Sequence, residues 1–146
     1  MSIIRAIEIN HFQYKVQRNW AYTYWMFDIH GTILRPNYKF GNTPKDFYPY
    51  AKETLQYLSK LSDVEMIIYT CSHPHEIEEY VKLFAESGIT FKFINENPEV
   101  VTQPNGYGCY DKKPYMNILF EDKAGFDPET EWLEVLEFMK TKYGLY

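Results

Sequence analysis

Residues 21–32 read AYTYWMFDIHGT, an apolar and aromatic run that ends in Asp28 and passes directly into Gly31 and Thr32. A continuous apolar run over 21–28 is typical of a strand buried on both faces of a parallel sheet. The glycine just behind it indicates a tight turn out of the strand. The segment therefore predicts a central strand with a carboxylate at its carboxyl end.

Working outward from this strand, the chain alternates between strand and helix patterns. Further apolar runs predict strands over 64–69, 90–94 and 116–121. Helical spacing of apolar residues predicts helices over 49–61, 75–87 and 129–143. Such alternation is typical of the α/β class, so we expect a Rossmann-like three-layer sandwich with a mostly parallel central sheet and no cap domain.

The N-terminal stretch is less regular. Residues 2–17 are interpreted as one or two short strands or as an extension of the fold. We therefore divide the chain into an N-terminal extension packed on the core, 1–21, and one domain over 22–146. The aromatic residues of the extension leave a protein-interaction module as a further hypothesis for this part.

Composition excludes several classes of protein. The net charge of −5 argues against a broad basic face and hence against strong nucleic-acid binding, which depends on Lys and Arg neutralising phosphates. A small phosphorylated substrate remains compatible with this charge. Cys71 and Cys109 are too few for a disulfide framework. With no signal peptide or apolar run of membrane-spanning length, we expect a cytoplasmic protein without membrane contact.

Polar side chains stand where three predicted strands end: Asp28, Thr70 and Asp122. Because ligands bind beyond the carboxyl ends of the strands in open α/β sheets, we expect these three groups to share one crevice.

Four motifs occur in order along residues 22–143. They are Asp28-Ile29-His30-Gly31-Thr32 after the first strand, Thr70-Cys71-Ser72 after the second, Lys113-Pro114, and Glu121-Asp122 after the last strand. Together they resemble the signature motifs of the haloacid-dehalogenase-like (HAD) hydrolase superfamily, and the chain is similar to its small members without a cap. The resemblance implies a HAD-like catalytic domain over 22–146.

The resemblance also implies a Mg²⁺-dependent phosphohydrolase, a phosphomonoesterase that acts through an aspartyl-phosphate. In that reading Asp28 is the nucleophile, Thr70 donates a hydrogen bond to the phosphoryl group, and Lys113 neutralises its charge. Lys112 is the alternative to Lys113. Mg²⁺ would be held by Asp28, Glu121, Asp122 and the backbone carbonyl of His30. The substrate-binding candidates are Gly31, Thr32, Cys71 and Ser72.

His30 departs from the motif, which usually carries an aspartate as acid and base at this position. Histidine exchanges protons near neutral pH and can fill that role. Mg²⁺ and Lys113 would oppose its protonated form. Three readings follow: a histidine-based phosphatase, a slow enzyme whose aspartyl-phosphate persists, or a catalytically attenuated phosphate-binding or regulatory protein.

The gaps at 34–49 and 95–112 are too short for a cap domain. The similarity to capless members implies a bulky substrate or a homo-oligomer whose contacts act as a lid. His73 and His75 are interpreted as residues of a helix start and not as metal ligands.

Overall fold

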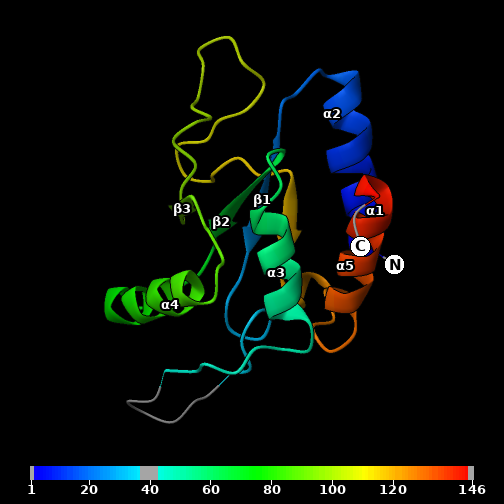
Figure 1. Cartoon of the computed structure of the whole chain (residues 1–146). Coiled ribbons are helices and arrows are strands. Elements are labelled where there is room, and N and C mark those ends of the chain that lie inside the picture. The colour runs from blue at the N-terminus through cyan, green and yellow to red at the C-terminus, as the bar shows by residue number, and fades with distance from the viewer. Residues whose placement is uncertain (1, 37–42, 145–146) are drawn as a thin grey trace.

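The computed structural model describes residues 2–36 and 43–144. Its centre is a parallel sheet of β1 (Thr23–Phe27), β2 (Val64–Ile68), β3 (Phe93–Ile94) and β4 (Ile118–Phe120), in the order β3-β2-β1-β4 (Figure 1). Every residue of β1 is buried, as the continuous apolar run predicted. The predicted α/β, Rossmann-like fold class is confirmed.

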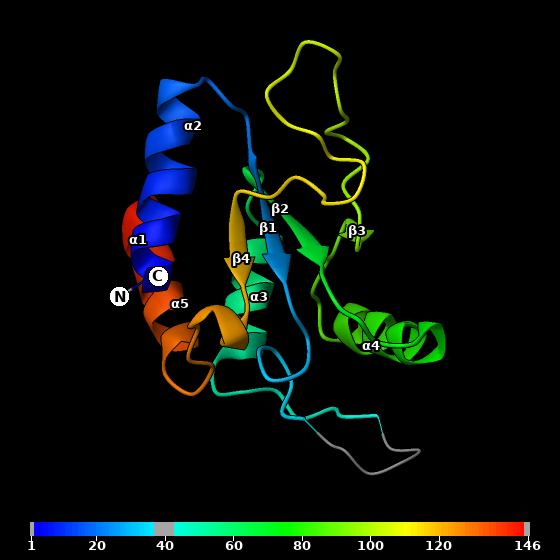
Figure 2. The same ribbon diagram turned by 180° about the vertical axis from the view of Figure 1, so that it is seen from behind.

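Helices cover one face of this sheet. They are α3 (Ala51–Ser59), α4 (Pro74–Glu86) and α5 (Glu131–Tyr143). Trp25 and Phe27 point to this face and join one large core cluster with Leu55, Phe84 and Trp132 from the three helices. Seen from behind, the strands lie in front of α3 (Figure 2). The main hydrophobic core therefore lies between the sheet and this helical layer.

The opposite face of the sheet carries a smaller cluster around Tyr24, Met26 and Ile67. The chain between β3 and β4 covers it, with Val100 and Tyr115 packed against the cluster. Parallel crossovers are right-handed, so a connection that runs back across β2 and β1 must pass over the face that the first two crossovers leave free. Between β3 and β4 the described chain has turns and bends and no helix or strand, so this third layer is irregular chain.

The N-terminal segment is helical, which corrects the alternative that it forms one or two short strands. It comprises α1 (Ser2–Ile7), the π-helix η1 (Glu8–Gln13) and α2 (Tyr14–Gln17), and it lies beside α5 in both ribbon views. Ile3, Ile7 and His11 recur at a spacing of four residues and are all buried. That spacing is typical of one helical face, although a polar residue, His11, completes it.

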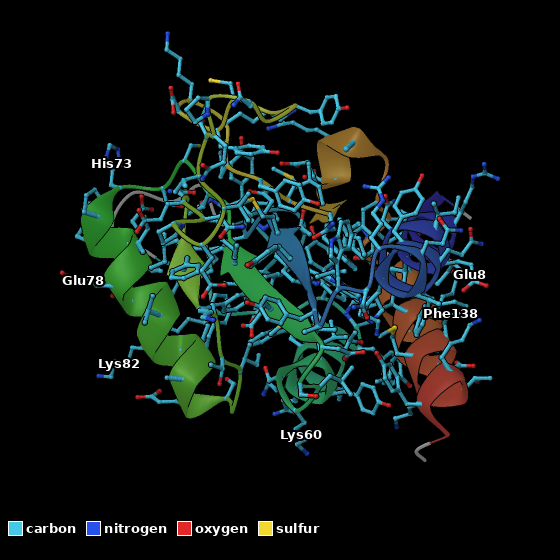
Figure 3. The ribbon with its side chains drawn as sticks, turned by 90° about the horizontal axis from the view of Figure 1, so that it is seen from above. Glu8, Lys60, His73, Glu78, Lys82 and Phe138 are labelled. Carbon is cyan, nitrogen blue, oxygen red and sulfur yellow. The ribbon has the colours of Figure 1, made fainter. Side chains whose placement is uncertain are left out.

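A buried hydrogen-bond network fastens this segment to the sheet. Nδ1 of His11 lies 2.6 Å from Thr23 Oγ1, and Nε2 lies 2.9 Å from the Tyr143 hydroxyl. Lys15 pairs with Asp63, which also accepts a hydrogen bond from Tyr143. Burial alone would raise the pKa of the Asp63 carboxyl, but His11, Lys15 and Tyr143 together hold it well below its usual range. Seen from above, the N-terminal helices and α5 lie near one edge of the sheet and α4 lies near the opposite edge (Figure 3). No described helix has both the length and the apolar character needed to cross a membrane.

Candidate active site

Three carboxylates meet where β1 and β4 end. Asp28 follows β1, and Glu121 and Asp122 follow β4. Each offers an oxygen, and the three oxygens lie within 4.8 Å of one another. The strand order reverses between β1 and β4, which is the topological switch point where ligands bind in open α/β sheets. The structure therefore brings together three of the predicted metal ligands.

The strand ends that carry these acids are fixed by aromatic packing. The rings of Phe27 and Phe120, the residues just before Asp28 and Glu121, stack with centroids 4.6 Å apart. The ring of Trp132 stacks on Phe120 at 5.3 Å. The Asp28 N–H donates to the Phe120 carbonyl at 3.0 Å, which fixes the register between the ends of β1 and β4.

The turn after Asp28 is built to approach Asp122 closely. Thr32 Oγ1 accepts a hydrogen bond from the Asp122 N–H at 3.1 Å and donates to the Asp122 carboxylate at 3.4 Å. The buried Trp132 indole donates to the Thr32 carbonyl at 2.8 Å. The backbone of Gly31 has a positive φ of 79°, a conformation that L side chains rarely adopt. The predicted substrate residues Gly31 and Thr32 thus lie in the site, where they orient Asp122.

Negative charge in this cluster is unbalanced. Among the described residues, no lysine or arginine forms an ion pair with Asp28, Glu121 or Asp122. Burial raises the pKa of Asp28, and the Asp122 charge adds to the rise. Burial, with hydrogen bonding to Asp122, raises the pKa of Glu121 to about 7. Raised carboxylate pKa values mean that the cluster favours bound protons or, in their place, a cation.

We expect Glu121 to make the metal-free protein less stable as the pH rises from about 4.5 to 7. In that interval the unfolded chain has released the Glu121 proton, whose ordinary pKa is 4.5, while the folded chain still holds it. The folded state binds more protons, so its stability falls with pH. Thermal unfolding in EDTA at several pH values measures this slope. Glu121→Gln should flatten it, whereas the same change at the exposed Glu96 should not; equal slopes in wild type and Glu121→Gln would contradict the assignment.

Gly31→Ala is expected to weaken cation binding as well as stability. A Cβ at this position would lie 2.9 Å from Asp122 Oδ2, so the carboxylate would have to move. Gly88→Ala is the matched control, because Gly88 has a similar φ of 74° and nothing within 4 Å of its added Cβ. Both changes should cost about 1–3 kcal/mol from backbone strain. Only Gly31→Ala should also reduce the rise in melting temperature that Mg²⁺ produces. An equal reduction in Gly88→Ala would contradict a specific clash between the Cβ of residue 31 and Asp122.

The second group of predicted residues lies at the neighbouring strand end. Thr70 follows β2 by two residues, and its N–H donates to Asn95 Oδ1 at 2.7 Å. Its hydroxyl lies 2.8 Å from Ser72 Oγ, and the Ser72 N–H donates to the same Thr70 oxygen at 3.2 Å. Ser72 is therefore tied to Thr70. Cys71 between them is exposed and has a free thiol.

His30 contacts α4 through a residue that sequence reasoning missed. Its Nε2 is hydrogen-bonded to the hydroxyl of Tyr80, whose side chain is fully buried, and the two rings meet edge to face at 5.3 Å. Burial raises the pKa of Tyr80 to about 12, with the charges of Glu76 and Glu79 adding to the rise.

The apolar residues of 75–87 that recur at helical spacing predict the core-facing side of this helix, and they are Ile77, Val81, Leu83 and Phe84. That face is partly wrong, because Val81 is 42% exposed while Tyr80 is buried beside Phe84. The spacing of four residues between Tyr80 and Phe84 was the available signal.

The structure does not bring Lys113 to the carboxylates. Lys113 is exposed and stands two residues before Tyr115, whose ring packs edge to face on Tyr24 near the start of β1. Four residues of strand, about 13 Å, separate Tyr24 from Asp28. Figures 1 and 2 show the β3–β4 segment extending past the end of the sheet where the strands begin. Lys112 belongs to the same segment, and among the described residues neither lysine forms an ion pair with the three carboxylates.

Comparisons with known proteins support the fold alone. No family model and no curated protein matches the chain. A solved structure of a conserved protein from Bacteroides thetaiotaomicron is similar, with a TM-score of 0.62 and 20% identity, over 83% of this chain and 92% of that one. The two chains therefore share an arrangement of strands and helices over most of their lengths.

Proposed function

We propose that this chain is a Mg²⁺-dependent phosphomonoesterase of the HAD-like superfamily, which uses Asp28 as its nucleophile. The observation that supports it best is the cluster of Asp28, Glu121 and Asp122 at the strand-order reversal, with oxygens within 4.8 Å and no paired cation among the described residues. Oxygen-rich, anionic clusters of this kind suit a hard divalent cation. The substrate class is a small phosphate monoester.

The donor set fits such an ion. Asp28, Glu121 and Asp122 would supply carboxylate oxygens, and Gly31 leaves room beside Asp122 where a Cβ would intrude. The His30 carbonyl would be a further ligand, since no described backbone N–H donates to it. When bound, Mg²⁺ would neutralise charge on the carboxylates and on the phosphoryl oxygens.

The residues of the chain then divide the reaction into two displacements. An oxygen of Asp28 forms a bond to phosphorus while the bond between phosphorus and the leaving oxygen breaks, giving an aspartyl-phosphate. His30 gives its proton to the leaving oxygen and afterwards takes one from the water that hydrolyses the intermediate. Thr70 donates a hydrogen bond to the phosphoryl group. The site thus supplies nucleophile, acid and base, and one hydroxyl donor.

A second candidate function is a phosphate-binding or regulatory protein with little turnover. Two observations favour it. Lys113 lies away from the carboxylates, so the cation that the motif supplies is missing from the described site. His30 is already engaged by Tyr80. Less charge stabilisation in the transition state would slow the reaction without preventing ligand binding.

Phosphate release separates the two functions. The full chain is incubated with an aryl phosphate and a panel of nucleotide and sugar phosphates, in Mg²⁺ and in EDTA. Release that requires Mg²⁺ supports the phosphatase. Absence of release, together with a melting temperature that Mg²⁺ raises, supports the binding protein. A protein that neither releases phosphate nor responds to Mg²⁺ contradicts both functions.

A further inference from the structure

A cavity of about 420 Å³ lies at the end of the sheet where the strands begin. Aromatic side chains and one amide line it: Trp20, Tyr22, Tyr24, Tyr115 and Asn117. They come from the chain that leads into β1 and the chain that leads into β4, which enter the sheet at the same end (Figure 2). The volume is in the range of pockets that hold small organic molecules. About 13 Å of strand separates Tyr24 from Asp28, so this cavity is distinct from the candidate active site.

Two tyrosine rings of the cavity stand at right angles to the ring of Tyr24. Tyr22 meets Tyr24 with ring centroids 5.6 Å apart and an interplanar angle of 88°. Tyr115 meets Tyr24 at 6.0 Å and 89°. The cavity therefore offers aromatic rings in more than one orientation, so a flat ring that lies on one of them would meet the edge of another. Both arrangements are favourable for aromatic pairs.

Hydrogen bonds hold this lining in place. Oδ1 of Asn117 accepts from the Tyr24 N–H at 2.8 Å, and Nδ2 of Asn117 donates to the Tyr115 hydroxyl at 2.8 Å. The Trp20 N–H donates to the Lys15 carbonyl at 2.9 Å, which ties the start of the lining to α2. These contacts form without a ligand, and a preformed cavity loses little conformational freedom when it binds one.

The unpaired charge beside the cavity is positive. The guanidinium of Arg18 lies over the Trp20 ring, 5.3 Å from its centroid, and among the described residues Arg18 forms no ion pair. Glu99 reaches the lining through a hydrogen bond from the Tyr24 hydroxyl, but it is paired with Lys92 at 2.6 Å. Arg18 would therefore attract a carboxylate or a phosphate and repel an organic cation.

We propose that this cavity is a second binding site, which takes a small anion built on a planar aromatic ring. The ring would lie among the tyrosines and Trp20, and its carboxylate or phosphate would pair with Arg18. A guanidinium suits either anion, because its planar fork donates two parallel hydrogen bonds. An aromatic carboxylate and a nucleotide share this chemistry. The site does not depend on the proposed phosphatase, which uses the opposite ends of the strands.

The test is a titration of the ¹⁵N-labelled full chain in EDTA, followed through the indole N–H signal of Trp20, which Trp20→Phe assigns. The indole N–H groups of Trp25 and Trp132 are internal controls, because they are buried donors to Thr23 and Thr32 and should not shift. Three probes share one ring and differ in charge: indole-3-acetate, indole and tryptamine. The Kd of indole-3-acetate should be about 10-fold below that of indole, and tryptamine should bind most weakly.

Two variants locate the site. Arg18→Gln should raise the Kd of indole-3-acetate about 10-fold and leave that of indole unchanged. Arg5→Gln is the matched control, because it removes the same charge at an exposed position of α1, and it should change neither value. Ala21→Leu enlarges an exposed residue of the lining, so it should fill part of the cavity and weaken the binding of every probe.

Adenosine 5′-monophosphate joins a planar ring to a phosphate and is the second arm of the titration. Tighter binding than indole-3-acetate supports a nucleotide as the ligand, and weaker binding supports an aromatic carboxylate. A Trp20 signal that neither compound shifts at millimolar concentration would overturn the proposal. Tryptamine binding as tightly as indole-3-acetate, or an unchanged Kd in Arg18→Gln, would overturn it as well. Absence of phosphate release would count against the proposed function alone, since no step of this titration requires turnover.

Discussion

Replacing Asp28 with asparagine is expected to lower Mg²⁺-dependent phosphate release by at least about a thousandfold, the scale on which loss of a covalent nucleophile acts. An amide does not attack phosphorus, and it is a poorer ligand for Mg²⁺ than a carboxylate. The measurement is phosphate release under saturating substrate, with melting temperature recorded in EDTA and in Mg²⁺.

The melting temperatures give this variant a second signature. Burial and the charge of Asp122 disfavour the ionised form of Asp28, so Asp28→Asn should raise the melting temperature in EDTA. The additional rise expected with Mg²⁺ in the wild type should be lost, since a ligand stabilises the folded state only when it binds that state at the concentration used. Asp111→Asn, at an exposed carboxylate of the β3–β4 segment, is the control and should change neither result. Retained phosphate release in Asp28→Asn would rule out Asp28 as nucleophile.

Deletion of residues 1–20 is expected to prevent stable folding. The deleted segment includes Ile3 and Ile7, which are 5% and 0% exposed, and His11, whose ring bonds Thr23 and Tyr143. Burial of each isoleucine contributes about 1.5–3 kcal/mol, and loss of both with the histidine network approaches the whole stability of a small domain. Far-UV circular dichroism and size-exclusion chromatography should show an unfolded or aggregated product.

Single substitutions test the structural role of the N-terminal segment residue by residue. Ile7→Ala should cost about 2–5 kcal/mol in urea unfolding, as large-to-small changes in a core do. Arg5→Ala, at an exposed position of the same helix, should cost little. A soluble, monomeric truncated protein that melts with the wild type would contradict the structural role and favour an interaction module in the N-terminal segment.

Local sequence patterns predict those parts of the site that stand directly at the end of a strand. Asp28 and the Glu121–Asp122 pair were found because each stands directly after a buried apolar run, and parallel strands bring their carboxyl ends to one edge. The strands, the three helices after β1 and the α/β class come from the same local patterns. The N-terminal helix carried a signal as well, in the spacing of Ile3, Ile7 and His11, but one polar residue in the row concealed it.

Three features were decided by the tertiary structure alone. The β3–β4 segment has no repeating pattern, so its course over the free face of the sheet, with Lys113 carried away from Asp28, follows from crossover handedness and from packing on Tyr24. The contact of Tyr80 with His30 joins residues 50 positions apart and depends on how α4 is rotated against the sheet. The unbalanced charge of the acidic cluster depends on burial. Periodicity and strand-end chemistry act over a few residues and can be recognised in the sequence, whereas chain routing, helix rotation and desolvation are set by contacts between distant segments.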